Sequence, residues 1–349
     1  MVEHYRTLVR KIFYAYLNNR YMEYNPSFGD YQYLVYHKLD MVFFSVCKNI
    51  KDIDPKLFIL FKSKRDKIEK VNKLYQDEVS RLILNFNNNG IKYAILKGWA
   101  CLVELYHNQS DRYFGDVDIL VDEQKLSEVE RILFDNGYQY GIEKEGKILR
   151  ADREKVLFQR YFTHEIYNMV KKYEDYCINI DVNFRFSWRG ENTSVIGNIK
   201  LNDINEFIVS YTYENRKYSI LDEELFFIHL CCHLANEAWF FHLNLEYAGG
   251  DPEEIYLFRI LDICLLLRHI NTKRVWEIAI KMDCIEHLEF LVGIIKVVMG
   301  EKYCSQFFGE IIGNEKLNKY MTNDGKWKEW PISIEERVFD PEVRKLINL

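Results

Sequence analysis

The sequence predicts an α+β fold in which a small mixed sheet is flanked by helical regions toward both ends of the chain. Apolar residues recur at helical spacing up to about residue 88 and again from about residue 222. Between these regions, short runs rich in β-branched and aromatic residues alternate with helical runs. We therefore predict three parts, namely an N-terminal helical region (1–88), a core sheet domain (89–221) and a C-terminal helical domain (222–349).

Each predicted element has a local reason. Leu8, Ile12 and Tyr16 are spaced four residues apart, as on one face of a helix, and Asn87–Gly90 is a turn-forming run that ends the first region. In the core domain we expect strands at 91–96, 116–121, 137–142, 161–169, 177–186 and 216–221, with helices at 99–107 and 125–136. A helical period returns after residue 222 and predicts long helices around 225–233, 255–265 and 288–298.

The composition limits the classes of partner. Lys and Arg number 47 against 53 Asp and Glu, and the net charge of −6 argues against the dense cationic surface that duplex nucleic acid requires. A local basic groove is still compatible with this balance. No uninterrupted apolar run approaches the ~18 residues that span a bilayer. We therefore expect a soluble, cytoplasmic protein without a membrane partner.

Two aspartates alternate on the predicted strand 116–121. Asp116 and Asp118 project from one face of this strand, while Val117 and Ile119 project from the other. Two like charges about 4 Å apart repel by about 4 kcal/mol at an effective dielectric constant near 20. A divalent cation offsets this cost, and ligands that are all oxygen favour Mg²⁺ or Mn²⁺.

A third acid lies on a strand whose alternation is complete. The even positions of 177–186 are apolar, while its odd positions carry Asn179, Asp181, Asn183 and Arg185. A polar face opposite a fully apolar one indicates a functional surface. If this strand pairs beside the first, Asp181 reaches the same ions. Three carboxylates could then hold two metal ions that activate an attacking oxygen and stabilise a leaving pyrophosphate.

A lysine and a glycine join a strand end to a helix start at Lys97-Gly98. Glycine lets the backbone approach a ligand closely, and the free N–H groups of a helix N-terminus suit phosphate oxygens. Lys97 and Arg112 would add positive charge against a triphosphate. The alternatives are a surface lysine at position 97 and an ion pair between Arg112 and Asp111 or Asp116.

Taken in this order, the motifs resemble the uncharacterised nucleotidyltransferase family (NTP_transf_5) within the DNA polymerase beta-like nucleotidyltransferase superfamily. The resemblance covers roughly residues 90 to 280. Asn183 stands where family members often carry His, and Gly98-Trp99 stands in place of the Gly-Ser pair of better-known superfamily members. The matching segments are Leu96-Lys97-Gly98, Tyr106, Arg112, Gly115–Val121, Ile180–Phe184, Leu230–His233 and Leu257–Asp262.

The resemblance implies transfer of a nucleoside monophosphate from an NTP, ATP in the first instance, to an acceptor hydroxyl with release of pyrophosphate. Mg²⁺ or Mn²⁺ is the implied cofactor. Asp116 and Asp118 would be metal ligands, and Asp181 would be the third acid, a further metal ligand and the base that deprotonates the acceptor. The implied nucleotide-binding residues are Lys97, Gly98, Arg112 and Gly115.

The acceptor is unidentified, and the acidic net charge favours a small molecule, a peptide or a protein over a long nucleic acid. We expect the C-terminal helices to close an acceptor cleft over the sheet. The candidate residues of this cleft are His164, Asn183, Arg185, His233 and Asp262.

Two other functions remain open from the sequence. One is a non-catalytic nucleotide-binding or scaffold protein with a degenerate nucleotidyltransferase fold, of which Asn183 is the first hint. The other is a metal-dependent hydrolase centred on His229, His233 and Asp262, because the two histidines lie one helical turn apart. The structural alternative for this trio is that the histidines hydrogen-bond Asp262 or backbone groups and hold the helices together.

Overall fold

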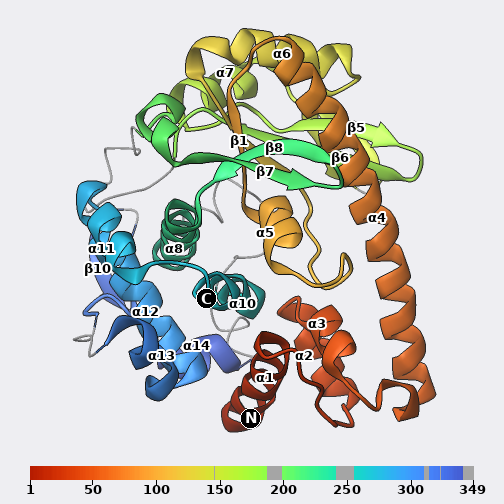
Figure 1. Ribbon diagram of the computed structural model, residues 1–349, viewed down its shortest axis with the longest axis vertical. Coiled ribbons are helices and arrows are strands. Elements are labelled where there is room, and N and C mark those ends of the chain that lie inside the picture. The colour runs from red at the N-terminus through yellow and green to blue at the C-terminus, as the bar shows by residue number, and fades with distance from the viewer. Residues whose placement is uncertain (145, 187–198, 241–254, 310–313, 323, 341–349) are drawn as a thin grey trace. The chain divides into compact units, whose positions relative to one another are not determined.

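A computed structural model describes residues 1–144, 146–186, 199–240, 255–309, 314–322 and 324–340 (Figure 1). The chain forms two compact units. One comprises Arg65–Asp222, and the other combines Met1–Lys64 with Glu223–Leu349. The predicted α+β fold, with a mixed sheet and helical regions before and after it, is confirmed. The three-part division at residues 88 and 221 stays a prediction.

The first unit contains a mixed sheet, which in its described part has eight strands in the order β4-β3-β5-β6-β2-β1-β8-β7. The pairs β2–β6 and β1–β8 are parallel, and the other neighbours are antiparallel. The strands are β1 (Tyr93–Leu96), β2 (Val117–Val121), β3 (Gln139–Lys144), β4 (Lys147–Arg150), β5 (Met169–Tyr173), β6 (Tyr176–Asn183), β7 (Ile208–Tyr213) and β8 (Arg216–Leu221).

Helices cover both faces of this sheet, with α6 and α7 on one side and α5 on the other (Figure 1). The helix α4 begins in one compact unit and ends in the other. Gly137, in the left-handed region at φ 85°, follows the end of α6, as the sequence predicts. The helices are α4 (Pro55–Asn88), α5 (Lys97–Leu105), α6 (Leu126–Asp135) and α7 (Arg153–Phe162), with short 3₁₀ turns η2 (Glu123–Lys125) and η3 (Leu201–Phe207).

The strand that we expected at 161–169 is wrong. The helix α7 runs to Phe162, and the strand β5 starts only at Met169. Asp152 caps α7, because its side chain accepts a hydrogen bond from the backbone N–H of Lys155 at 2.8 Å. The exposed aromatic residues of α7 give this helix a composition typical of a strand. At the two edges of the sheet lie β4 and β7, which we did not expect.

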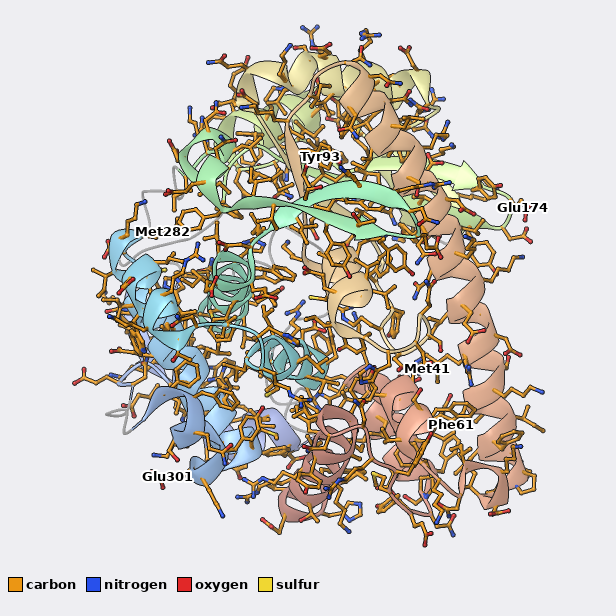
Figure 2. All side chains as sticks on the ribbon, viewed as in Figure 1. Met41, Phe61, Tyr93, Glu174, Met282 and Glu301 are labelled. Atoms are coloured by element: carbon orange, nitrogen blue, oxygen red, sulfur yellow. The ribbon has the colours of Figure 1, made fainter. Side chains whose placement is uncertain are left out.

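The apolar core of the sheet unit lies around the central strands. All residues of β1 and β2 are buried, including Asp118. In Figure 2, Tyr93 of β1 lies inside the unit, while Glu174 lies at the exposed turn between β5 and β6. The acid-bearing strand β2 is therefore part of the buried core of the unit.

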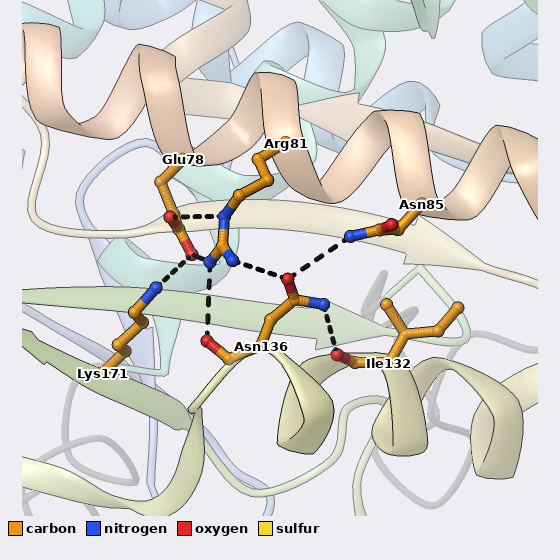
Figure 3. A network of polar contacts seen from close by, with 6 residues as sticks. All are labelled: Glu78, Arg81, Asn85, Ile132, Asn136 and Lys171. Carbon is orange, nitrogen blue, oxygen red and sulfur yellow. Dashed lines mark hydrogen bonds and ion pairs between the residues drawn. The ribbon is translucent and has the colours of Figure 1, made fainter.

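A polar network joins α4 to the end of α6 (Figure 3). Arg81 donates from Nη1 to Asn136 Oδ1 at 2.7 Å and from Nε to Glu78 Oε2 at 3.2 Å. Lys171 of β5 places its Nζ 3.1 Å from Glu78 Oε1. The buried Glu78 carboxylate is thus paired with two cations, which fixes α4 against the sheet unit.

The second unit is mainly helical. The long helices predicted after residue 222 are confirmed as α8, α10 and α12. Arg10 of α1 donates from Nε to the carbonyl of Val298 on α12 at 2.7 Å, which joins the two ends of the chain. The elements are α1 (Val2–Leu17), α2 (Phe28–Tyr36), α3 (Asp40–Val46), η1 (Ile50–Asp52), α8 (Glu223–Trp239), α10 (Leu257–Leu266), α11 (Thr272–Lys281), α12 (Ile285–Met299), α13 (Glu301–Phe308), β9 (Lys319–Met321), β10 (Trp327–Glu329) and α14 (Ile334–Phe339).

Among the helices of the described residues, none combines the length and the apolar character needed to cross a membrane.

Candidate active site

The two acid-bearing strands are direct neighbours. β2 and β6 pair in parallel, and the register places Asp118 opposite Asp181. Asp116 comes immediately before β2, two residues from Asp118, and is partly exposed. Parallel strands carry the side chains of paired residues on the same face, so the pairing brings the three predicted acids to one end of the two central strands.

Lys97 reaches this end of the sheet from the next strand. β1 pairs with β2 so that Leu96 lies opposite Asp118, and Lys97 follows as the first residue of α5. Its Nζ lies 2.7 Å from Asp118 Oδ1, with 25% of the lysine side chain and 7% of the aspartate side chain exposed. Lys97 is therefore part of the site rather than a surface lysine.

Gly98 is required by packing. A Cβ atom at this position would lie 2.8 Å from Cβ of Phe114, so a larger residue would push the start of α5 away from the segment that leads into β2. The close approach made possible by Gly98 is thus one between two parts of the chain. A role for its backbone N–H toward phosphate is compatible with this packing.

Gly115 is held by its carbonyl group. Tyr75 of α4 donates its hydroxyl to the Gly115 carbonyl at 2.6 Å and accepts from the backbone N–H of Asn179 at 3.2 Å. The Asn179 side chain donates to the same carbonyl at 3.0 Å. These three bonds tie the residue before Asp116 to β6, the strand that carries Asp181, and so fix the two acids relative to each other.

Arg112 is buried, and its guanidinium donates to the backbone carbonyl of Tyr113. Its own carbonyl accepts from the side chain of Asn72 at 2.9 Å. In this structure the arginine therefore shapes the loop before β2, and a role in holding a triphosphate stays a prediction.

A fourth acid, Glu165, joins the site and was not among the predicted residues. An isolated bridge pairs it with Asn183, the last residue of β6, and Gln159 of α7 donates to its carboxylate at 2.8 Å. Its sequence signal was weak, because Glu165 falls in the stretch that we expected to be a strand. We use the name acid cluster for Asp116, Asp118, Glu165 and Asp181.

The pKa values within the acid cluster report crowded negative charge. Burial, followed by Asp116, Glu165 and Asp118, raises the pKa of Asp181 well above its usual range. Burial also raises the pKa of Glu165 to about 7, although Lys97 acts in the opposite direction. Both carboxyl groups therefore hold a proton at higher pH than ordinary carboxyl groups do.

Lys97 responds to the same crowding. Burial acts to lower the pKa of its ammonium group, but Asp118, Asp116 and Glu165 outweigh burial and raise the pKa above its ordinary value. The group is therefore firmly cationic at neutral pH. Asn168, just before β5, also contributes, since its side chain donates to Asp181 Oδ1 at 2.7 Å.

The candidate acceptor residues of the sheet unit have different interaction partners in the structure. His164 Nε2 lies 3.8 Å from Glu165 Oε2, next to the acid cluster. Asn183 is buried and donates from Nδ2 to the carbonyl of Asp181 at 3.4 Å. Arg185, in contrast, directs its Nη2 to Glu123 Oε1 at 2.6 Å, so its charge is engaged by an ion pair.

The remaining candidates lie in the other compact unit. His233 of α8 places its Nε2 3.3 Å from Glu237 Oε1, and Arg259 forms an ion pair with the same carboxylate. Asp262 of α10 is buried. Within the described part of the chain, no three potential ligands gather into a metal centre. The hydrolase hypothesis based on His229, His233 and Asp262 therefore lacks the metal site that it requires.

The acid cluster suits a divalent cation in its chemistry. In the described ranges, no three carboxylate, imidazole or thiol groups form a ready-made ligand set, and at Asp118 the ammonium of Lys97 takes the cation's place. All candidate ligands are carboxylates, the groups that Mg²⁺ and Mn²⁺ prefer. Burial and then the repulsion between the acids raise the pKa of Asp181, and a divalent cation would offset this repulsion.

Comparisons with known proteins point to one family. The family model described as "Uncharacterised nucleotidyltransferase" matches residues 31–300. No curated protein matches the sequence. The fold is similar to lincomycin-bound lincosamide antibiotic adenylyltransferase LnuA, at 18% identity and a TM-score of 0.30, over 56% of this chain and 97% of that one. An antigenic nucleotidyltransferase-like protein from Paracoccidioides brasiliensis is similar at 13% identity and a TM-score of 0.32, over 56% of this chain and 75% of that one.

Proposed function

This chain belongs to the family of uncharacterised nucleotidyltransferases, and we propose that it transfers a nucleoside monophosphate from an NTP, ATP in the first instance, to an acceptor hydroxyl with release of pyrophosphate. The observation that carries this proposal is the parallel register of β2 and β6, which sets Asp118 opposite Asp181 with Asp116 two residues away. Acids crowded together at one end of two neighbouring strands repel one another and call for a counter-charge.

The roles of the acids follow from their positions. Asp116 and Asp118 would hold Mg²⁺ or Mn²⁺, and Asp181 would complete the ligand set. When bound there, the ion neutralises the triphosphate and lowers the pKa of the attacking hydroxyl. The family resemblance also implies that Asp181 is the base that deprotonates the acceptor hydroxyl, and its place opposite Asp118 supports that role.

The groups beside the acids would bind the triphosphate and orient the acceptor. Lys97 would supply a positive charge at the start of α5, and the N-terminus of a helix suits phosphate oxygens. Glu165 and His164 lie on the segment that bridges to the end of β6. In this proposal they would contact the acceptor hydroxyl. For the acceptor we favour a small molecule, a peptide or a protein, in keeping with the net charge of −6.

The test is a transfer assay with labelled NTPs, Mg²⁺ and a cell extract as the source of acceptors. We expect pyrophosphate and a labelled acceptor from the parent protein, and neither from the variant Asp116→Asn. Asp175→Asn is the matched control, since Asp175 is an exposed aspartate in the turn between β5 and β6. Equal activity of Asp116→Asn and the parent would exclude this mechanism.

A second candidate function is nucleotide binding without transfer. It is favoured by Asn183, which takes the position where family members often carry His and is buried against Asp181. Calorimetry separates the two functions. Tight NTP binding together with no pyrophosphate release across many acceptors would support the non-catalytic protein.

A further inference from the structure

Lys97 is held at the acid cluster by its backbone. It is the junction between β1 and α5, and its φ of 45° lies in the left-handed region that residues other than glycine rarely adopt. Such a conformation is retained only where the surroundings enforce it. Here the neighbouring strand pairing, with Leu96 opposite Asp118, directs the lysine to the acids. Its ammonium ends 2.7 Å from Asp118 Oδ1.

This contact uses the carboxylate that the proposed function assigns to a metal ion. A direct ion pair of 2.7 Å occupies the Asp118 oxygen that faces Lys97. A divalent cation that binds this oxygen must displace the ammonium or share the oxygen with it at strong repulsion. Free metal ions are therefore disfavoured as long as Lys97 remains on Asp118.

A bound nucleotide would compete with Asp118 for the ammonium of Lys97. Phosphate oxygens carry more negative charge than one carboxylate and offer the ammonium of Lys97 an alternative partner at the start of α5. If the ammonium moved to a phosphate group, Asp118 would become available to a cation. The negative charge of the bound triphosphate would favour the same cation. The other members of the acid cluster, Asp116, Glu165 and Asp181, would then face a stronger cation than a single ammonium.

We propose that Lys97 couples nucleotide binding to metal binding: its ammonium occupies Asp118 in the nucleotide-free protein and exchanges to the triphosphate, so that the divalent cation enters together with the nucleotide. This inference rests on the proposed function and assigns Lys97 as a positioning residue. Coupling between two ligands is reciprocal, so the metal ion strengthens nucleotide binding by the same factor.

The experiment measures Mn²⁺ binding by electron paramagnetic resonance on the full-length protein, with and without α,β-methylene-ATP. In the parent, we expect the nucleotide analogue to strengthen Mn²⁺ binding at least about tenfold. In Lys97→Met, Mn²⁺ alone binds about tenfold more tightly than in the parent, because Asp118 is free, and the gain from the analogue falls to about twofold. Lys97→Gln, which keeps a polar side chain, should behave in the same way and serves if Lys97→Met fails to fold.

Lys171→Met is the matched control. Lys171 is also a lysine of the sheet unit in contact with a buried carboxylate, Glu78, at 3.1 Å. Lys171→Met removes the same charge as Lys97→Met, but at a residue outside the acid cluster. It should therefore leave the tenfold coupling intact. Parent-like coupling in the folded Lys97 variants overturns the inference and leaves the proposed function standing. A parent protein that binds neither the analogue nor Mn²⁺ in its presence overturns both.

Discussion

Two groups of carboxylates in the sheet unit are balanced in opposite ways. At Glu78, burial acts to raise the pKa, but hydrogen bonds from Arg81 and Lys171 outweigh it and lower the pKa (Figure 3). In the acid cluster, burial and like charges prevail, and the pKa of Asp181 and of Glu165 is raised. Two cations of the chain balance the single Glu78 carboxylate, whereas in the acid cluster Lys97 faces several carboxylates, and we propose that a divalent cation balances the remainder.

This difference distinguishes a structural network from the proposed active site. Buried ion pairs that satisfy each other hold elements together, and breaking them destabilises the fold. Clustered acids with raised pKa values cost stability in the metal-free protein and are typical of sites that bind or react. The two groups lie in the same sheet unit, so substitutions in one serve as controls for the other.

The largest expected effect is on transfer. Asp118→Asn should lower the rate of pyrophosphate release by about 10³-fold, equivalent to about 4 kcal/mol, because the site loses a charged metal ligand. Glu78→Gln should leave the rate per folded molecule within about twofold of the parent, since Glu78 belongs to the structural network. Initial rates at saturating NTP and Mg²⁺ measure both. Similar losses in the two variants would erase the distinction between the networks.

The next effect is on stability. Glu78→Gln should destabilise the protein by about 3 kcal/mol, because Arg81 and the largely buried Lys171 then lose the buried carboxylate that they share. Urea unfolding of the metal-free protein provides the measurement. Asp175→Asn, in the exposed hairpin turn, should change the free energy of unfolding by less than about 0.5 kcal/mol. A loss below 1 kcal/mol for Glu78→Gln would show that the network contributes little.

The pH dependence of stability should differ in sign between the two groups. The ordinary pKa of Glu165 is 4.5, and in the folded protein it is raised to about 7. The folded state therefore binds its proton more tightly than the unfolded state, so stability from this group is present below pH 4.5 and is lost as the pH rises to about 7. The loss amounts to at most about 3 kcal/mol.

Glu165→Gln removes that loss, so at pH 8 the metal-free variant should be more stable than the parent, while at pH 4.5 the two should be equal. Urea unfolding at half-unit pH steps would reveal the window. Glu78 titrates in the opposite direction, because its pKa is lowered and its contribution is lost on acidification. A Glu165→Gln variant that is less stable than the parent at pH 8 would contradict the account of crowded charge.

The smallest effect concerns the two hydrogen bonds by which the Tyr75 hydroxyl joins Gly115 to β6, which we call the clamp. Tyr75→Phe removes the hydroxyl that donates to the Gly115 carbonyl and accepts from the Asn179 backbone. We expect a loss of about 1 kcal/mol in the free energy of unfolding and a several-fold slower transfer, since Asp116 follows Gly115. Tyr161→Phe, at a side chain that is 74% exposed, is the control. A slow but fully stable variant would assign the clamp to positioning alone.

The sequence was informative where local pattern and structure coincide. The alternation along 177–186 predicted both the strand β6 and its polar face, and the alternation along 116–121 predicted the strand β2, although Asp116 lies just before this strand. The long helices after residue 222 also followed from their period. In each case the segment's own neighbours decide its structure.

The remainder depended on contacts between distant segments. The parallel pairing of β2 with β6 spans some sixty residues and leaves no local signal. Glu165 joins the acid cluster through an isolated bridge, in a stretch where exposed aromatic residues of α7 resembled a strand. Arg185, a candidate residue of the acceptor cleft, forms an ion pair with Glu123, a partner that only the folded chain brings close. Tertiary contacts decided all three.

The most direct test of the central claim is a crystal structure of the protein with Mn²⁺ and α,β-methylene-ATP, analysed by anomalous scattering. We predict an anomalous peak within coordination distance of Asp116 and Asp118, with the α-phosphate beside the peak. We also predict that the ammonium of Lys97 has moved from Asp118 to the triphosphate. A bound nucleotide whose Mn²⁺ lies away from both aspartates, with Lys97 still on Asp118, would contradict the central claim.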